Sequence, residues 1–403
     1  MRKQEPARSF ERAIIGIVVL LAFVVLFEVS NAIFPSIPPT LDTPELSAQE
    51  AGLSETLQAR VTRVLEERPE NAENRQQLYQ KLELLVTHGS LKGQHIVVEQ
   101  GLLTLTSAAM QYKTGDQILV EYTHGPQGDH FVITDFIRLK SLFWLGVGFA
   151  LIALVVGRWK GLFSLIGTAF SFVIILRFIL PQILAGRDPV LVSVVGSVIL
   201  MGCTLYIVYG WEMQTHAAAG GLFLSLVLTA LLAALFVNWS RLSGFSTDEA
   251  TFLMMESSIS IDPRGLLLSG IIIGALGVLD DIAVGQASAI FRLSAVNPDL
   301  DWRSLFEHGM KIGRDHIAGM VNTLVLAYVG ASLPFMLLFS LYSEPFLQTV
   351  NRGFIAEEIV RTLVGSMGLI ATVPLTSLLA SWLAASQATR YEIVDGEHSA
   401  TAK

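Results

Sequence analysis

Eight long apolar runs with almost no charge constrain this chain more than any other feature. They cover residues 13–34, 141–157, 161–185, 189–209, 217–237, 265–285, 318–341 and 362–385. Most of them reach the roughly 20 residues that an α-helix needs to cross about 30 Å of hydrocarbon. Because lipid offers a backbone no hydrogen-bond partner, each run should be helical. The sequence predicts an all-α polytopic membrane bundle of about eight transmembrane helices.

The composition agrees with lipid as the main solvent and excludes several function classes. Only 15% of the residues are charged, against roughly 25% in average soluble domains. The single cysteine, Cys203, excludes a disulfide within the chain and a zinc site built on several thiolates. The net charge of −8 provides no basic footprint for nucleic acid. We therefore expect the lipid bilayer as a partner, no nucleic acid and no cofactor.

The first apolar run, residues 13–34, follows four basic residues, as a secretory signal would. These are Arg2, Lys3, Arg8 and Arg12. The apolar part of a signal peptide is only about 7 to 15 residues long and ends in small residues. We interpret the longer run found here as a retained transmembrane anchor that follows a basic cytoplasmic N-terminus, residues 1–12.

Residues 35–140 contain no run that is long and apolar enough to cross a bilayer. Short stretches rich in Val, Ile and Leu recur there with a period of two, at 59–65, 81–87, 94–98, 117–122 and 130–137. A hairpin candidate, Gly125-Pro126-Gln127-Gly128-Asp129, separates the last two. The pattern predicts a small β-rich, barrel-like domain between helices 1 and 2, folded as an antiparallel barrel or sandwich.

Lys and Arg in the short loops indicate the orientation, because cytoplasmic loops carry an excess of them. With the N-terminus inside, twelve lie on the cytoplasmic side: Arg2, Lys3, Arg8, Arg12, Arg158, Lys160, Arg292, Arg303, Lys311, Arg314, Arg390 and Lys403. Five lie outside: Arg187, Arg241, Arg264, Arg352 and Arg361. This predicts cytoplasmic N- and C-termini, an extracytoplasmic domain at 35–140, a seven-helix transmembrane domain at 141–385 and a cytoplasmic tail at 386–403.

Polar side chains concentrate in the sixth and seventh predicted spans and in the loop between them. They are Asp280, Asp281, Gln286, Arg314, Asp315, His316, Asn322, Thr323 and Tyr328. Ionisable side chains are costly in hydrocarbon, so those found there usually face protein or water and mark function. We take these nine residues as candidate substrate- or ion-binding residues, and we predict no catalytic and no metal-binding residue.

Helical periodicity arranges these residues on two faces. In the sixth span Asp281 shares a narrow stripe with Gly270, Gly274 and Gly277, and such stripes let a neighbouring helix approach closely. Two adjacent carboxylates should not both ionise easily in a low dielectric. In the seventh span Asp315, His316, Asn322 and Thr323 fall within about 120° of one another. Antiparallel packing of the two spans would make these groups partners.

Several alternatives stay open at this point. The polar residues could form an ion-pair network that serves helix assembly only. Asp280, Asp281, Asp315 and His316 could in principle hold a divalent ion, although no spacing demands it. An intramembrane aspartate protease would need Asp281 and Asp315 to face each other. The chain has no P-loop, Gly-x-Ser-x-Gly or His-Glu-x-x-His sequence that would indicate an enzyme.

Several motifs resemble those of the YibE/F family of bacterial multi-span proteins. They are the stretch from Gly274 to Ala289, Asn297-Pro298, Ile312 to Ile317, Asn322 to Tyr328 and Leu333-Pro334. The resemblance covers most of residues 101–385. It implies an N-terminal span, an extracytoplasmic strand-rich segment ending in a Tyr-x-x-Gly-Asp hairpin, here Tyr112 to Asp116, and a block of further spans. It also implies the bacterial cytoplasmic (inner or plasma) membrane, and it names no biochemical activity.

The polar residues favour a transporter or permease-like protein. Asp280 and Asp281 would bind a proton or cation, residues 314–316 would gate or pair with them, and Asn322 and Thr323 would offer uncharged ligands for a small solute or ion. The alternative is a scaffold or sensor without transport activity. In that case residues 45–138 would bind an envelope protein, and the polar residues would only hold the helices together.

Overall fold

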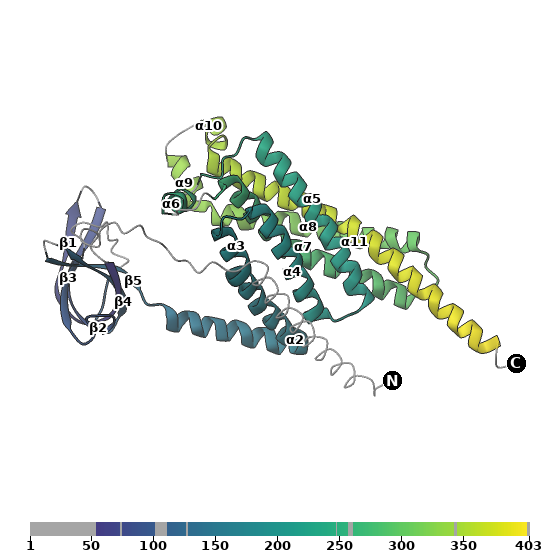
Figure 1. Cartoon of the computed structure of the whole chain (residues 1–403), viewed down its shortest axis with the longest axis horizontal. Helices are drawn as coiled ribbons and strands as arrows, with labels where there is room; N and C mark the ends of the chain where they lie inside the picture. Colours follow the sequence, from purple (N-terminus) through teal and green to yellow (C-terminus); the bar gives the residue numbers. More distant parts are fainter. Residues whose placement is uncertain are drawn as a thin grey trace. The chain divides into compact units, whose positions relative to one another are not determined.

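The computed structural model describes residues 54–72, 75–100, 111–125, 128–246, 248–256, 261–341 and 345–400. The predicted N-terminal tail and anchor, residues 1–34, therefore lie outside the described part. The chain divides into two compact units. One, Pro38–Ile152, holds all the described strands, and the other, Met1–Ile37 with Ala153–Lys403, holds most of the helices (Figure 1).

Five antiparallel strands form the first unit. They are β1 (Ser54–Ala72), β2 (Arg75–His88), β3 (His95–Gln100), β4 (Gln117–Gly125) and β5 (Gly128–Phe136). The order in the sheet is β3-β2-β1-β4-β5, and the two outer strands, β3 and β5, also contact each other. The sheet is therefore curled, so that its two edge strands approach each other. The predicted β-rich domain is confirmed as a small curled antiparallel sheet.

The barrel core follows from the alternation of side chains along each strand. Leu57 of β1 is paired with Val120 of β4, and Val61 of β1 with Leu84 of β2, and all four side chains are at most 1% exposed. Three register shifts between β1 and β2 bend the long first strand, so that it can pair with β2 and β4 at once. The barrel therefore closes around one apolar core.

The Tyr-x-x-Gly-Asp segment is the turn that leads into β4. Tyr112 is buried and stacks on Phe136, with 4.7 Å between the ring centroids. Its backbone forms a reciprocal pair with the buried amide of Gln80, at 2.9 and 3.0 Å. Gly115 has φ 99°, and the side chain of Asp116 accepts a hydrogen bond from Lys113 N at 2.8 Å. The segment thus serves the fold of the barrel.

The second unit is helical, and α2 enters it from the first. The elements are α2 (Leu139–Ile174), the π-helical segment η2 (Ile175–Ile179), α3 (Leu180–Leu184), α4 (Pro189–Tyr209), α5 (Met213–Trp239), α6 (Asp248–Glu256), α7 (Pro263–Val296), α8 (Trp302–Ala331), α9 (Leu333–Leu341), α10 (Phe346–Val350) and α11 (Gly353–Ala400). In Figure 1, α5, α7 and α11 run side by side, and each contacts the other two.

The prediction of eight spans is confirmed only in part. Within the described residues five helical runs are long and apolar enough to cross a membrane, or six if α8 and α9 count as one bent span. The second and third predicted spans form one run, Leu139–Leu184, whose backbone leaves the helical region at Arg158 with φ 51° and ψ −131°. This break lies where the sequence predicts the connection between them.

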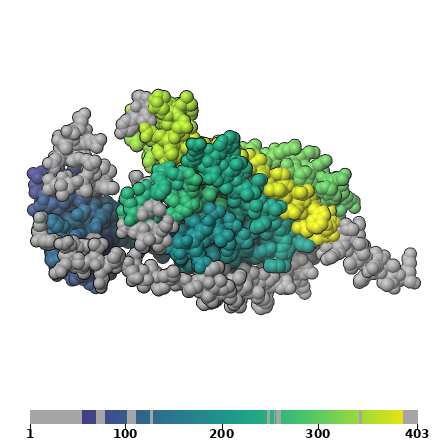
Figure 2. Space-filling model, turned by 45° about the horizontal axis from the view of Figure 1, so that its top comes forward, coloured from purple at the N-terminus to yellow at the C-terminus, as the bar shows by residue number. Residues whose placement is uncertain are grey.

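The seventh predicted span differs most from its expected form. Instead of one helix at 318–341, α8 begins at Trp302, ends at Ala331 and is followed by α9 at a bend of 62°. Pro334 explains the bend, because proline lacks an N–H and disfavours helical backbone at the residue before it. Figure 2 shows α9 and α10, in yellow-green, protruding from the rest of the helical unit.

The closest helix packing lies between α5 and α11. A Cβ atom at Gly221 of α5 would collide with Thr376 of α11, and one at Gly368 of α11 would collide with Thr229 of α5. The sequence had instead predicted close packing along the α7 glycine stripe. Along that stripe a Cβ at Gly270 or Gly277 would meet nothing within 4 Å in the described chain, whereas one at Gly274 would lie 3.4 Å from the Tyr328 hydroxyl of α8. Among these three glycines, the expected close approach is therefore found only at Gly274.

Candidate functional site

Asp280 and Asp281 lie near the middle of α7. The sixth predicted span ends at residue 285, but α7 continues to Val296, so the two carboxylates have helix on both sides. Successive residues of a helix project about 100° apart. The two aspartates therefore face different neighbours, and only Asp281 is exposed on the surface of the helical unit.

Asp281 faces α8. Its carboxylate lies within range of electrostatic interaction with the His316 ring, the pairing expected from the sequence. His316 is exposed, as are Asn322 and Thr323, two turns further along α8 on the same side. Asp281, His316, Asn322 and Thr323 together are called here the α7–α8 polar face. Asp281 is exposed in the described structure, which corrects the expectation that it is enclosed in a helix interface.

Asp280 lies near the end of α4. Tyr209, the last residue of α4, lies within electrostatic range of both aspartates. The Oδ1 atom of Asp280 is buried and has no hydrogen-bond partner among the residues that the structure describes. A buried carboxylate oxygen without a partner is energetically costly. Tyr209 was not among the residues singled out in the sequence, because it ends an apolar run and looks like an interfacial anchor.

Gln286 is buried and hydrogen-bonds to two neighbouring helices. Its side chain is 4% exposed, and Nε2 donates to Gly309 O of α8 at 2.6 Å and to Ser377 Oγ of α11 at 2.8 Å. A Cβ at Gly309 would collide with Ile290 of α7 and one at Gly313 with Val373 of α11, so the two glycines let α8 approach both helices beside this amide. We therefore assign Gln286 to helix assembly, and it has no free donor for a solute.

Arg314 and Asp315 are exposed on α8. Among the described residues no ion pair joins either of them to the aspartates of α7. The structure thus brings together Asp281 and His316, but it does not show the wider network that a gate of residues 314–316 would need. The described residues also contain no group of three or more His, Cys, Asp or Glu that could hold a metal ion.

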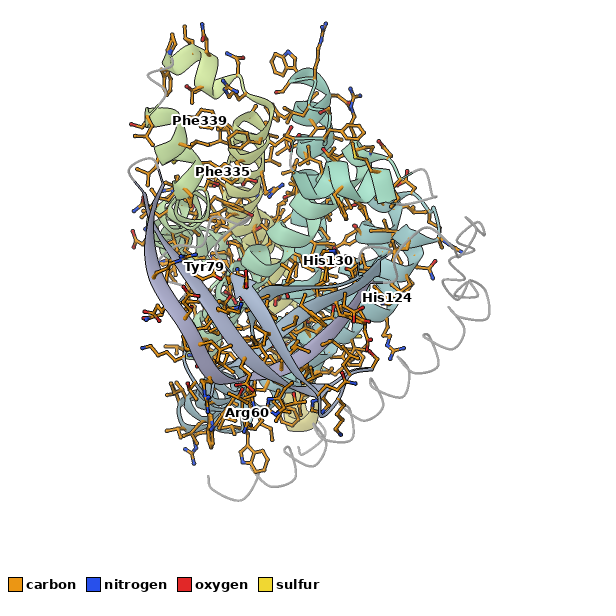
Figure 3. All side chains as sticks on the ribbon, turned by 90° about the vertical axis from the view of Figure 1, so that its left-hand side faces the viewer. Arg60, Tyr79, His124, His130, Phe335 and Phe339 are labelled. Carbon is orange, nitrogen blue, oxygen red and sulfur yellow. The ribbon has the colours of Figure 1, made fainter. Side chains whose placement is uncertain are left out.

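Tyr328 lies away from the aspartates, in a large apolar cavity. The cavity has a volume of about 530 Å³ and lies between α8, α9, α10 and α11, with Phe335, Phe339 and Phe354 in its wall. Figure 3 labels the first two of these phenylalanines. A Cβ at Gly274 would lie 3.4 Å from the Tyr328 hydroxyl. Tyr328 therefore holds α7 near α8, and it is not part of the α7–α8 polar face.

A smaller polar cavity of about 220 Å³ opens one helical turn from Asp280. Its lining comprises Lys160 from α2, Leu205 and Tyr209 from α4, Gln214, Thr215 and Ala218 from α5, and Val284, Ser288 and Arg292 from α7. We call it the basic cavity. Val284, Ser288 and Arg292 are spaced four residues apart and so line the cavity from one side of α7. In the sequence Lys160 and Arg292 look only like loop charges, because nothing in it shows that they meet.

Comparisons with known proteins agree with the membrane assignment. The family model described as YibE/F-like protein matches residues 145–386, more than half of the chain. Neither the curated proteins nor the solved structures give a significant match. The matched region includes both aspartates and the whole of α4, α5, α7 and α8.

Proposed function

The chain belongs to the YibE/F-like protein family, and we propose that it is a transporter or permease-like protein of the bacterial cytoplasmic membrane. Its long apolar helices suit a membrane protein. In the proposed orientation both termini are cytoplasmic and the barrel is extracytoplasmic, in accord with the distribution of Lys and Arg. The substrate is a small solute or ion whose passage is coupled to a proton or cation.

One observation carries the proposal: the buried Oδ1 of Asp280 lacks a partner among the described residues, in the middle of an apolar helix. A carboxylate there is stabilised either by taking a proton or by binding a cation. The neighbouring Asp281 carboxylate makes it more costly for Asp280 to carry a negative charge as well. The pair is therefore suited to hold one exchangeable positive charge.

The two carboxylates lie between two polar regions. Asp281 shares the α7–α8 polar face with His316, and both aspartates lie within electrostatic range of Tyr209, which lines the basic cavity. A proton or cation passed from one aspartate to the other would move between these two regions without leaving α7. Asn322 and Thr323 would offer oxygen ligands on the polar face, and Gln286 would keep α7, α8 and α11 in register.

The experiment is an ion-flux measurement in proteoliposomes. Purified full-length protein is reconstituted around a pH-sensitive dye, and decay of an imposed proton gradient is followed with Na⁺ or K⁺ outside. We expect wild type to dissipate the gradient faster than empty vesicles. Asp280→Asn and Asp281→Asn should return the rate to that of empty vesicles, and His316→Ala should lower it.

Asp299→Asn provides a matched control, since this aspartate is exposed in the connection between α7 and α8. It should leave flux unchanged. If wild-type flux is measured and the changes at Asp280, Asp281 and His316 all leave it intact, the site is assigned wrongly.

A second candidate rests on the barrel. Val97 of β3, Val132 of β5 and Leu65 of β1 are 50%, 46% and 45% exposed on the outer surface of the barrel. Such side chains suit contact with an envelope protein. In a scaffold or sensor of this kind, deletion of residues 54–138 would abolish function, whereas Asp280→Asn would alter stability alone. The reverse pattern would favour transport.

A further inference from the structure

The basic cavity defined above holds two cations that no acidic side chain in its wall neutralises. Lys160 comes from α2 and Arg292 from α7, and no carboxylate belongs to the described lining. The Lys160 ammonium lies 5.8 Å from the centre of the Tyr209 ring, which lines the cavity. Lys160 and Arg292 are both exposed, and two cations at the rim of one cavity repel each other unless an anion lies between them.

Uncharged hydrogen-bond donors surround the same space. Thr215 is only 2% exposed, and its Oγ1 has no hydrogen-bond partner among the described residues. Gln214, Ser288 and Tyr209 add an amide and two hydroxyl groups to the wall. Leaving a buried hydroxyl unpaired costs free energy, and an acceptor oxygen inside the cavity would remove that cost.

The position of Thr215 adds a further preference for an anion. Gln214 and Thr215 belong to the first turn of α5, which begins at Met213. The N-terminus of a helix carries partial positive charge, although the backbone N–H of Thr215 itself donates to Glu212 O at 2.9 Å. The preceding acidic residue, Glu212, does not cap this helix with its side chain, and its Oε2 accepts a hydrogen bond from Gln214 Nε2 at 2.7 Å.

From this geometry we propose that the basic cavity binds a phosphate group. Lys160 and Arg292 would neutralise its charge, and Thr215, Gln214 and Ser288 would donate to its oxygens. The cavity volume of about 220 Å³ is several times the roughly 30 Å³ taken by one water, so a phosphate group fits. The group could belong to the headgroup of an anionic lipid, or it could be free phosphate or part of a soluble phosphorylated solute. The proposal does not depend on transport.

The test is a thermal-stability measurement on the full-length protein in a neutral detergent. In one arm sodium phosphate is compared with sodium chloride at equal ionic strength. In the other, mixed micelles of phosphatidylglycerol are compared with phosphatidylcholine. A rise in melting temperature with phosphate identifies a soluble anion as ligand, and a rise only with phosphatidylglycerol identifies a lipid headgroup. No rise in either arm overturns the proposal.

Variants show whether the rise comes from this cavity. Lys160→Gln combined with Arg292→Gln should weaken binding about tenfold or more, because charge-assisted hydrogen bonds are lost. Lys311→Gln is the control, since Lys311 is exposed on α8 outside the cavity. It should leave the rise unchanged. An equal rise in the double variant would show that the anion binds elsewhere.

Thr215→Val keeps the test decisive if the double variant folds poorly. The change keeps the shape of the side chain and removes a buried hydroxyl that lacks a partner. The unliganded variant should therefore be at least as stable as wild type, while its response to phosphate or phosphatidylglycerol becomes smaller. A response equal to that of wild type would exclude Thr215 from the site and, with it, the proposed binding geometry.

Discussion

The amide nitrogen of Gln286 donates a hydrogen bond to the hydroxyl of Ser377 at 2.8 Å, joining α7 to α11 inside the helical unit. The same nitrogen donates to Gly309 O on α8. One buried side chain thus joins α7 to the next helix, α8, and to α11, whose Ser377 lies 91 residues further along the chain.

Replacing this amide should destabilise the bundle. Gln286→Leu leaves Gly309 O without its donor in a buried environment, so we expect a loss of about 1 to 3 kcal/mol in unfolding free energy. The loss can be measured as the folded fraction that remains after heating in detergent. Gln348→Leu, at an exposed glutamine of α10, is the matched control. Equal stability of the two variants would contradict the structural role of Gln286.

Glu357 of α11 should also contribute to the stability of the helical unit. It is 4% exposed, and its Oε1 accepts from Gly244 N at 3.1 Å and from Ser246 Oγ at 2.6 Å, which ties the segment after α5 to α11. Glu357→Ala should cost about 1 to 3 kcal/mol, because a buried N–H loses its acceptor. Glu357→Gln keeps an acceptor oxygen and should cost less. Proteolysis of the α5–α6 connection in the two variants would show the difference.

Gly115 should be sensitive to any side chain. Its φ of 99° is unfavourable for residues with a Cβ. We expect Gly115→Ala to destabilise the barrel by about 1 kcal/mol or more. Thr114→Ala, one residue earlier at an exposed position of the same turn, is the control and should be nearly neutral. Hydrogen exchange of the β1 and β4 amides in the full chain measures the effect of both changes. Equal protection of these amides in the two variants would refute the prediction.

The β4–β5 hairpin should loosen in acid. His124 Nδ1 lies 2.6 Å from Asp129 Oδ1, and this hydrogen bond holds the pKa of Asp129 below its usual 3.8. A carboxyl whose pKa is lowered by folding adds stability above its unfolded pKa and loses it as pH falls through the folded pKa. Opening of the hairpin should therefore increase between about pH 5 and about pH 3. Figure 3 labels His124 and the neighbouring His130.

Hydrogen exchange of the hairpin amides, corrected for intrinsic exchange rates, measures this opening. Asp129→Asn removes the titrating group, so its hairpin should lack this part of the pH dependence. Glu99 and Asp135 also have a lowered pKa, because Lys81 and Arg138 donate hydrogen bonds to them. The rest of the barrel should consequently weaken in acid in both proteins. If the hairpin opened with the same pH profile in wild type and in Asp129→Asn, the role of Asp129 would be disproved.

Local pattern alone determined much of this protein. A period of two located all five strands of the barrel, and uncharged apolar length located α4, α5, α7 and α11. Both patterns reflect whether each side chain faces water, lipid or the protein core. They can be recognised from residues that are close together in the sequence. The same reasoning placed Asp281 next to His316, because wheel position and depth follow from sequence spacing.

Only the tertiary structure decided which helices touch and which polar groups lack a partner. It placed the close glycine contacts between α5 and α11, gave Gln286 two partners on other helices, and brought Lys160 and Arg292 to one cavity. Each of these depends on side chains that are far apart in the chain. Helical periodicity gives the direction in which a residue points, but packing of the whole bundle determines what it meets there.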